Sequence, residues 1–271
     1  MMNANQSCWG MFEGRYNLIT IDFGEGFNTA SVTNMGEMFT ECSRLTNLDL
    51  SNFNTENVTD MSDMFEWCSS LTSLDLSNFN TENVTDMSGM FWACYNLTSL
   101  DLSNFNTENV TSMRWMFCEC YDLKNIDLTC FNTENVTDMY GMFTECTSLT
   151  NLDLSNFNTE NVTDMCQMFC MVGEISCENS NLTSLDLSNF NTENVTDMSQ
   201  MFLGLSSLMS LDLSHFNMSG VTNKNYMCEN LATTSGACTI TCPAAVQMEL
   251  QNGTDLPTSG VTFTWLRPTS K

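Results

Sequence analysis

The sequence is poor in positive charge. Seven lysine and arginine residues stand against 33 aspartate and glutamate residues, which gives a formal net charge of −26 over 271 residues. Proteins that bind nucleic acid neutralise phosphates with lysine and arginine, and anionic membrane surfaces attract basic segments. The composition therefore argues against a nucleic-acid partner and disfavours anionic membranes, while cations and basic partners remain plausible.

Long apolar runs and catalytic motifs are also missing from the sequence. No run of about 18 apolar residues is present to span a membrane, and the opening MMNANQSC has neither the basic nor the apolar segment of a signal peptide. The single histidine, His215, stands alone, and no nucleophile elbow, phosphate-binding loop or metalloprotease motif occurs. We therefore expect no membrane insertion, no catalytic residues and no enzyme.

What the sequence does contain is a 26-residue repeat, which reads LTSLDLSNFNTENVTDMSGMFWACYN from Leu71 to Asn96. A fixed period of this size is typical of a solenoid, in which stacked coils bury a continuous apolar face. One step is seven residues longer than the others, because of an insertion between Cys170 and Ser180. The copies, marked by the first residue of the LDL-type core, begin at Leu48, Leu74, Leu100, Ile126, Leu152, Leu185 and Leu211, with a degenerate copy at Ile21.

The pattern within one copy predicts a short strand followed by a short helix. The alternation around Leu74 and Leu76 is typical of a half-buried strand. Val84, Met87 and Phe91 recur at the spacing of one helical face, which predicts one or two helical turns on the opposite side of the coil.

Three units follow from this reading of the chain. We predict an N-terminal cap over residues 1–17, a solenoid of about eight coils over residues 18–230, and a small α+β C-terminal cap over residues 231–271. Within the C-terminal cap, residues 238–242 read as a strand, residues 244–251 as a helix that begins after Pro243, and residues 261–265 as a final strand.

The opening L-x-x-L-x-L of each copy matches the leucine-rich repeat pattern. Phenylalanine, as at Phe79, replaces the usual asparagine or cysteine, so we expect residues such as Asn80 or Thr81 to bond the corner backbone instead. The string LTSLDLSNFNTENVTDMSGMF, with Cys94 three residues later, resembles the BspA-like leucine-rich repeat surface proteins. The resemblance covers roughly residues 8–230.

This resemblance implies a right-handed leucine-rich repeat solenoid with a parallel strand face and short helices on the other side. It also implies a protein displayed on or shed from microbial cells, hence a cell-surface or extracellular location, and a protein or glycan ligand on a host or neighbouring cell. It supplies no catalytic residue. The oligomeric state is not predicted.

Cysteine is abundant, with 14 residues. Five of them lie three residues after a Met-Phe pair on successive coils, where free cysteine behaves as a small buried apolar residue. We predict a reduced ladder, and no zinc site, because the spacings do not fit one. Bridges are more plausible between Cys170 and Cys177, Cys238 and Cys242, or Cys118 and Cys130. The ladder consists of Cys42, Cys68, Cys94, Cys120 and Cys146.

An aspartate occupies the outward position of every predicted strand and forms a candidate acidic binding face, expected to be concave. Either these carboxylates bond local backbone and hydroxyl groups, or they bind Ca²⁺ weakly between coils through oxygen ligands. No other metal or cofactor is indicated. The acidic strand face consists of Asp49, Asp75, Asp101, Asp127, Asp153, Asp186 and Asp212.

The copies differ most around the Met-Phe pair, and these slots collect aromatic residues. Exposed aromatic residues with an occasional arginine are typical of binding hot spots, so we predict a recognition ridge on the convex side. We favour a non-enzymatic ligand-binding or adhesion protein. The alternative is a structural spacer or regular-array protein with a cation-binding acidic face. The candidate aromatic ridge consists of Trp67, Trp92, Tyr95, Arg114, Trp115, Tyr121 and Tyr140.

Overall fold

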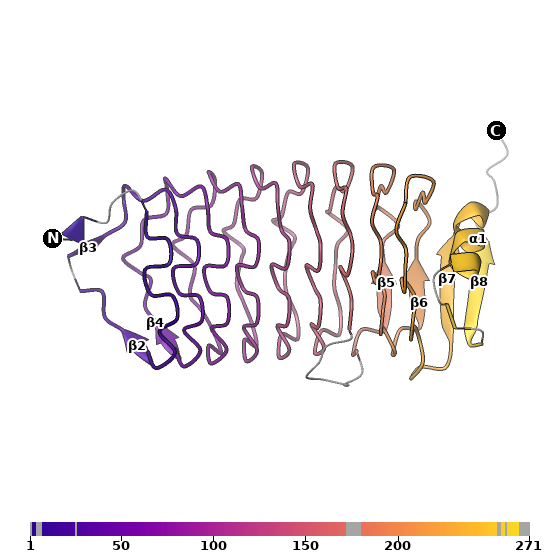
Figure 1. Cartoon of the computed structure of the whole chain (residues 1–271), viewed down its shortest axis with the longest axis horizontal. Coiled ribbons are helices and arrows are strands. Elements are labelled where there is room, and N and C mark those ends of the chain that lie inside the picture. Colours follow the sequence, from indigo (N-terminus) through magenta and orange to yellow (C-terminus); the bar gives the residue numbers. More distant parts are fainter. Residues whose placement is uncertain are drawn as a thin grey trace.

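The repeats fold into coils that stack side by side along a rod. Figure 1 shows this computed structural model with the two chain termini at opposite ends of the rod. The structure describes residues 2–3, 7–24, 26–171, 180–253, 256–257 and 259–265. Eight parallel bridges join nine successive coils, from Ser7 to Asn223. The predicted parallel solenoid is therefore confirmed, while the boundaries of its three units stay predictions.

Regular strands are short, and they lie mainly at the two ends of the rod. β1 (Met2–Asn3) pairs with β3 (Phe27–Asn28), and β2 (Thr20–Ile21) pairs with β4 (Asn47–Leu48), both in parallel. A four-stranded parallel sheet at the other end has the order β5 (Ser184–Asp186), β6 (Ser210–Asp212), β7 (Cys238–Cys242) and β8 (Val261–Trp265). The helix α1 (Ala244–Gly253) connects β7 to β8. The elements predicted for the C-terminal cap are thus confirmed.

The prediction of short helices opposite the strands is wrong. We call this segment the turn side; it spans residues 60–68 in one coil and the equivalent residues in the others. The amide of Phe65 donates to the oxygen of Met90 in the next coil at 3.0 Å, whereas the amide of Glu66 donates back to Asp63 at 3.1 Å. Asp63 and Trp67 have φ values of 55° and 56°. A helix requires consecutive right-handed residues and bonds within one segment, so the turn side is a chain of tight turns.

Two positions in most coils adopt this left-handed conformation, which glycine accepts without a steric cost. Glycine fills them in some copies, as at Gly89 (φ 58°) and Gly141 (φ 61°). At Gly141 the bare backbone also makes room for a neighbour, because an added Cβ would lie 2.4 Å from Cδ1 of Trp115. Other copies hold larger residues in the same conformation and carry backbone strain.

Replacing such a strained residue with glycine should stabilise the protein. Glu37 has a φ of 54°, and its pKa is raised by partial burial and by the charges of Glu13 and Asp60. We expect Glu37→Gly to increase the free energy of unfolding by about 1 kcal/mol, because it removes a left-handed strain of about that size and a repelled carboxylate. The midpoint of urea unfolding measures this change.

The matched control is Glu56→Gly. Glu56 lies outside the set of left-handed residues and its side chain is exposed. Glycine at an ordinary backbone position costs about 0.5–1 kcal/mol, so this variant should be less stable than the parent. A destabilised Glu37→Gly variant would contradict the assignment of strain to the turn side.

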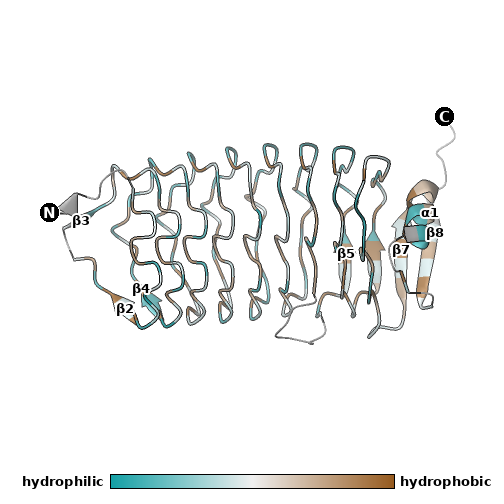
Figure 2. Ribbon diagram, in the orientation of Figure 1, coloured by the Kyte–Doolittle hydropathy of each residue, from teal (hydrophilic) through white to brown (hydrophobic). Residues whose placement is uncertain are grey.

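One file of phenylalanine rings runs through the core of the rod. Neighbouring rings are almost parallel, with centroids 5.6–6.1 Å apart and interplanar angles of 3–12°. In Figure 2 apolar and polar residues are interleaved along all the coils, so every coil contributes to this core. The file consists of Phe12, Phe39, Phe65, Phe91, Phe117, Phe143, Phe169 and Phe202.

The predicted cysteine ladder is confirmed beside this file. Its five thiols are free and buried, and each contacts a phenylalanine carbonyl of the preceding coil, as Cys94 Sγ does with Phe65 at 3.2 Å. Burial raises the pKa of Cys94 to about 12, so the thiol remains a neutral donor. Cys118, Cys130, Cys238 and Cys242 are free as well, whereas Cys177, the predicted partner of Cys170, lies outside the described residues.

The corner backbone is bonded by two kinds of side chain. Thr81 Oγ1 donates to the oxygen of Asn106 at 2.9 Å and accepts from the amide of the same residue at 2.8 Å. Asn78 Nδ2 donates to Phe53 O at 2.8 Å in the preceding coil. Asn80 or Thr81 was predicted to bond the corner backbone, and both do, since Asn80 Oδ1 accepts from the amide of Glu82 at 2.9 Å. The contribution of Asn78 and of equivalents such as Asn104 was not predicted.

Candidate functional site: an aromatic ridge on the turn side

The structure brings all seven residues of the aromatic ridge together on four adjacent coils, five of them on the turn side and Tyr95 and Tyr121 directly after it. They form two contacting clusters. In the first, Trp67 meets Tyr95 edge to face with ring centroids 5.6 Å apart. Tyr95 then stacks on Tyr121 of the next coil at 4.9 Å. The three rings therefore form one continuous aromatic surface across three coils.

The second cluster centres on Trp115. Its ring packs against Trp92 at 4.8 Å and against Tyr140 at 5.3 Å. The guanidinium of Arg114 lies over both neighbouring rings, 4.4 Å from the Trp115 centroid and 3.9 Å from the Tyr140 centroid. Its Nη1 atom is also 3.6 Å from Asp138 Oδ2. The cation is thus held in place by two ring faces and one carboxylate.

Glu119 links the two clusters, although it is not one of the seven residues predicted for the ridge. Its Oε1 accepts from Trp92 Nε1 at 3.3 Å, and its Oε2 accepts from Tyr121 Oη at 3.1 Å. Glu119 occupies a left-handed position with a φ of 59°. The signal available in the sequence was its position between two aromatic slots, because a carboxylate there has indole and phenol donors within reach.

The ridge is half-buried and its phenols stay neutral. Burial, with the charge of Glu119 as the second cause, raises the pKa of Tyr95 to about 12. The pKa values of Tyr121 and Tyr140 are also raised, chiefly by burial. Trp67 is 37% exposed, whereas the other six residues are intermediate in exposure. The surface therefore offers fixed rings to a ligand, whereas Tyr95 Oη is buried and Tyr121 Oη is bonded to Glu119.

The acidic strand face lies elsewhere, on the outer positions of the LDL segments. There Asp75 Oδ1 accepts from the amide of Ser77 at 3.0 Å, and hydrogen bonds from this serine lower the pKa of Asp75. The same contact recurs in every copy, so each carboxylate has a local partner. The amide donors belong to Ser51, Ser77, Ser103, Thr129, Ser155, Ser188 and Ser214.

None of the functionally curated proteins matches the chain. The model of a family described as "Mycoplasma protein of unknown function, DUF285" matches residues 6–125, 94–176 and 171–239. The chain belongs to the DUF285 family. The ridge of this DUF285 protein lies within the matched residues.

A solved structure is also similar to this DUF285 protein. It is a leucine-rich repeat protein from Bacteroides ovatus ATCC 8483, whose crystal structure was determined at 1.19 Å resolution. The two chains are 14% identical, with a TM-score of 0.35, and the match covers 96% of this chain and 86% of the other.

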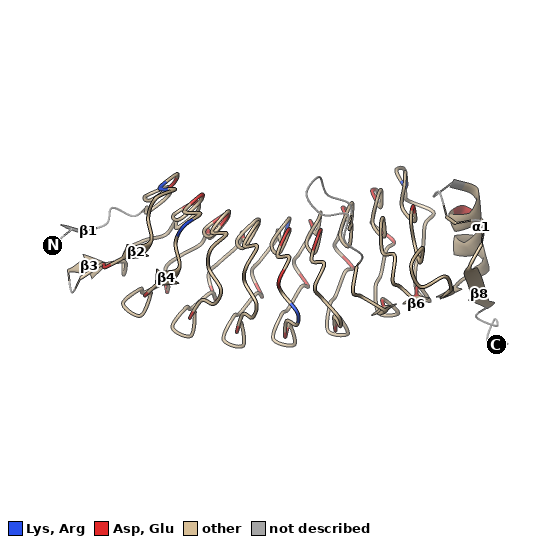
Figure 3. Ribbon diagram, turned by 90° about the horizontal axis from the view of Figure 1, so that it is seen from below, with Lys and Arg blue, Asp and Glu red and all other residues tan. Residues whose placement is uncertain are grey.

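Charge is spread along the whole DUF285 rod. Figure 3 shows acidic residues on every part of its length and basic residues only singly. Among the residues that the structure describes, no three His, Cys, Asp or Glu side chains are grouped so as to hold a metal ion. Weak binding of Ca²⁺ to the acidic strand face therefore stays a prediction. In the same described part, no helix is long and apolar enough to span a membrane.

Proposed function

We propose that this DUF285 protein is a non-enzymatic binding solenoid of the BspA-like type, which recognises a protein or glycan ligand through its aromatic ridge at a cell surface or outside the cell. The observation that carries this proposal is the gathering of six aromatic rings and one arginine into two clusters joined by Glu119. Rigid aromatic side chains and arginine are the residues that dominate binding energy at protein interfaces.

Coil stacking alone does not require these rings. The slot of Trp115 holds Gln167 and Gln200 in later coils, with φ values of 58° for both glutamines and 55° for the tryptophan. The main-chain bonds to the next coil persist at these glutamines, with Gln167 N donating to Ser199 O at 2.9 Å. The aromatic residues are therefore additions to a backbone that forms without them, which favours a role in recognition.

The ridge also has the chemistry that such a ligand needs. Ring faces pack against apolar sugar faces or side chains, while the carboxylate of Glu119 and the guanidinium of Arg114 orient polar groups. Because neighbouring rings and ion pairs already fix these side chains, little rotamer entropy is lost when a ligand binds. The size of the ridge, which extends over four coils, favours an extended ligand.

The test is a screen of arrayed glycans and immobilised extracellular proteins with the full chain. For each bound ligand, the triple variant Trp67→Ala, Trp92→Ala and Trp115→Ala should weaken binding by at least about 100-fold, because hot-spot residues each contribute about 2 kcal/mol or more. The variant should remain folded, as circular dichroism can check, although its melting temperature should fall because the ring contacts of the three tryptophans are lost. Full affinity in the triple variant would contradict the proposal.

A matched control is Tyr226→Ala. Tyr226 is 51% exposed and occupies the same slot as Trp115 in the last coil, with a φ of 56°. It lies outside the ridge, so its loss should leave binding unchanged.

A regular-array protein is the second candidate, and the repeated geometry of the acidic strand face favours it. Hydrogen bonds lower the pKa values of five of its aspartates, namely Asp49, Asp75, Asp101, Asp127 and Asp153, so these stay ionised at neutral pH. The variant Asp75→Asn, Asp101→Asn and Asp127→Asn tests this function. Binding that is lost here but kept in the tryptophan variant would favour the array.

A further inference from the structure

The N-terminal end of the rod exposes apolar side chains of the first coil. Trp9 is 55% exposed, Tyr16 is 56% exposed and Ile19 is 48% exposed. Tyr16 is nevertheless fixed, because its hydroxyl donates to Glu41 Oε2 at 2.7 Å. We call this surface the N-terminal face; it consists of Trp9, Met11, Phe12, Arg15, Tyr16 and Ile19.

The same face presents an unused row of backbone acceptors. In the second coil, the oxygens of Gly36, Met38 and Thr40 accept from amides of the first coil at 2.9–3.0 Å. The equivalent oxygens of the first coil belong to Trp9, Met11 and Glu13, and no described residue donates a hydrogen bond to them. Exposed acceptors beside exposed apolar groups are what an edge offers to a partner.

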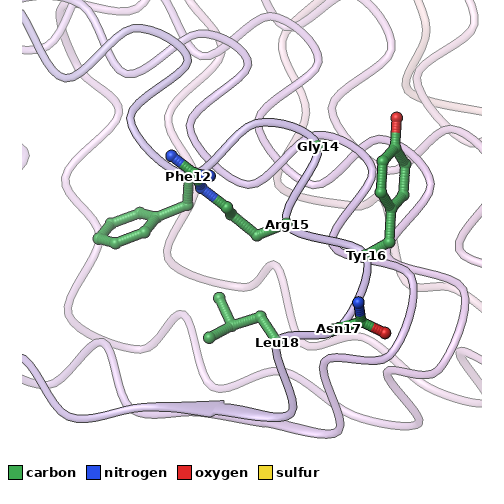
Figure 4. Close-up of a pocket in the computed structure, with 6 residues that line it drawn as sticks. All are labelled: Phe12, Gly14, Arg15, Tyr16, Asn17 and Leu18. Carbon is green, nitrogen blue, oxygen red and sulfur yellow. The ribbon is translucent and has the colours of Figure 1, made fainter.

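A hollow of about 520 Å³ opens in this face. Phe12, Arg15 and Leu18 line it, together with the backbone of Gly14 (Figure 4). Phe12 is the first ring of the phenylalanine file and stacks on Phe39 at 5.6 Å on one side. No described ring stacks on its other side, so the file ends at the hollow.

The opposite end of the rod is only partly covered, because β8 is there the edge strand of its sheet. There α1 lies beyond the last coil (Figure 1), Val246 and Leu250 are buried in the core, and Lys224 Nζ forms an ion pair with Glu249 at 2.5 Å. On the side of α1, a second copy therefore cannot stack its first coil as the coils stack within one chain.

We propose that the N-terminal face is a self-association surface, on which a second copy of this chain docks end to end about a two-fold axis. In such a contact the same patch is used on both copies. It buries the exposed rings and Ile19 against their counterparts, and it closes the hollow in front of Phe12. The aromatic ridge of each copy lies away from this contact, so dimerisation does not depend on what the ridges bind.

Charge complementarity is the reason that the occupant is a second copy. Arg15 is exposed on this face, and a guanidinium has five N–H donors. In a two-fold contact, Arg15 of each copy meets the acceptor row and the carboxylate of Glu13 on the other copy. Coil 52–77, by comparison, carries five acidic residues and no basic residue, so lateral contacts between copies are repelled there.

Sedimentation velocity from micromolar to hundreds of micromolar protein, at about 0.15 M salt to screen the net charge, tests the proposal. We expect a monomer–dimer equilibrium, and small-angle scattering should give the dimer about twice the maximum dimension of the monomer. Ile19→Glu and Arg15→Glu, each at an exposed position, should weaken dimerisation by at least about tenfold. Tyr16→Arg is a further variant, should either of these fail to fold.

The matched control is Met248→Glu, which places a carboxylate on α1 at the opposite end of the rod, where Met248 is 63% exposed. It should leave dimerisation unchanged. A chain that stays monomeric at all concentrations would overturn the proposal. So would a dimer of unchanged maximum dimension, or a dimer that persists in folded Ile19→Glu and Arg15→Glu variants. The triple tryptophan variant of the ridge should dimerise like the parent, so the two proposals fail separately.

Discussion

Phe117→Ala is expected to lower the free energy of unfolding by about 4 kcal/mol, the largest single effect predicted here. Phe117 is fully buried. Its ring stacks on Phe91 and Phe143, both with centroids 5.7 Å away and with interplanar angles of 4° and 12°. Truncation removes the transfer free energy of the ring, leaves a cavity and breaks two aromatic contacts worth about 0.5–1.5 kcal/mol each.

The position of the ring in the file provides a matched control. Phe12 begins the same file, has one stacked neighbour in it and is only half-buried. The same truncation, Phe12→Ala, should therefore cost roughly half as much when measured at a protein concentration that keeps the chain monomeric. Urea unfolding followed by circular dichroism measures both variants. Equal costs at the two positions would contradict a core stabilised by stacking between coils.

Acidification from pH 8 to about pH 5 should stabilise the protein. Burial, with repulsion by neighbouring acidic groups such as Glu37 and Glu41, raises the pKa of Asp63 to about 6 and that of Glu66 to about 7. The ordinary values are 3.8 and 4.5. Between the ordinary and the raised pKa values the folded chain binds more protons than the unfolded chain, so stability falls as the pH rises.

The expected size of this change follows from the pKa shifts. One pKa unit corresponds to about 1.36 kcal/mol, but both side chains are only half-buried and solvent screens their charges. After this discount we expect about 2 kcal/mol for the pair between pH 8 and pH 5. Melting temperatures measured across this range at constant ionic strength test the prediction.

Below about pH 4 the trend should reverse, because the pKa values of aspartates such as Asp75 and Asp101 are lowered by hydrogen bonds from serine. The stability that these aspartates contribute is fully present above their ordinary pKa of 3.8. It is lost as the pH falls through the lower pKa that they have in the folded chain. The most stable state is therefore expected near pH 5, and not at neutral pH.

Two sets of variants separate these causes. Asp63→Asn combined with Glu66→Gln should flatten the stability profile between pH 5 and pH 8. Asp75→Asn should alter it only below about pH 4. If the double variant keeps the slope of the parent, the profile must come from the net charge of the whole chain.

The stacking of the coils could be predicted from the sequence because the period of the repeat is strict. A spacing of 26 residues places Cys68 above Cys42 and Phe65 above Phe39 whatever path the backbone takes between them. The C-terminal cap could be predicted for a different reason, since Pro243 marks the beginning of its helix.

The turn side could not be predicted from apolar spacing alone. Val84, Met87 and Phe91 fit one face of a helix, but a chain of tight turns buries the same residues. The discriminating signal was glycine at equivalent slots in separate copies, as at Gly89 and Gly141, which marks a left-handed backbone. Aromatic residues in the neighbouring slots masked this signal.

The ridge was predictable as a set of residues but not as a connected surface. The slots of Trp92 and Trp115 differ by three residues within the repeat, so their contact at 4.8 Å depends on how far the coils are offset. The bridging role of Glu119 depends on the same offset.

The one-way hydrogen bonds of the turn side give the rod an electrical polarity. Phe65 N donates to Met90 O, and Phe91 N donates to Met116 O, always toward the C-terminal end. Each peptide unit has a dipole of about 3.5 D, and several per coil add along the axis. Backbone hydrogen bonds between threonines on another side of the rod, such as that from Thr85 N to Thr59 O, point the opposite way, but they are fewer. The N-terminal end is thus the negative pole. In the proposed two-fold dimer two such poles meet, and Arg15 of each copy is the cation that offsets them.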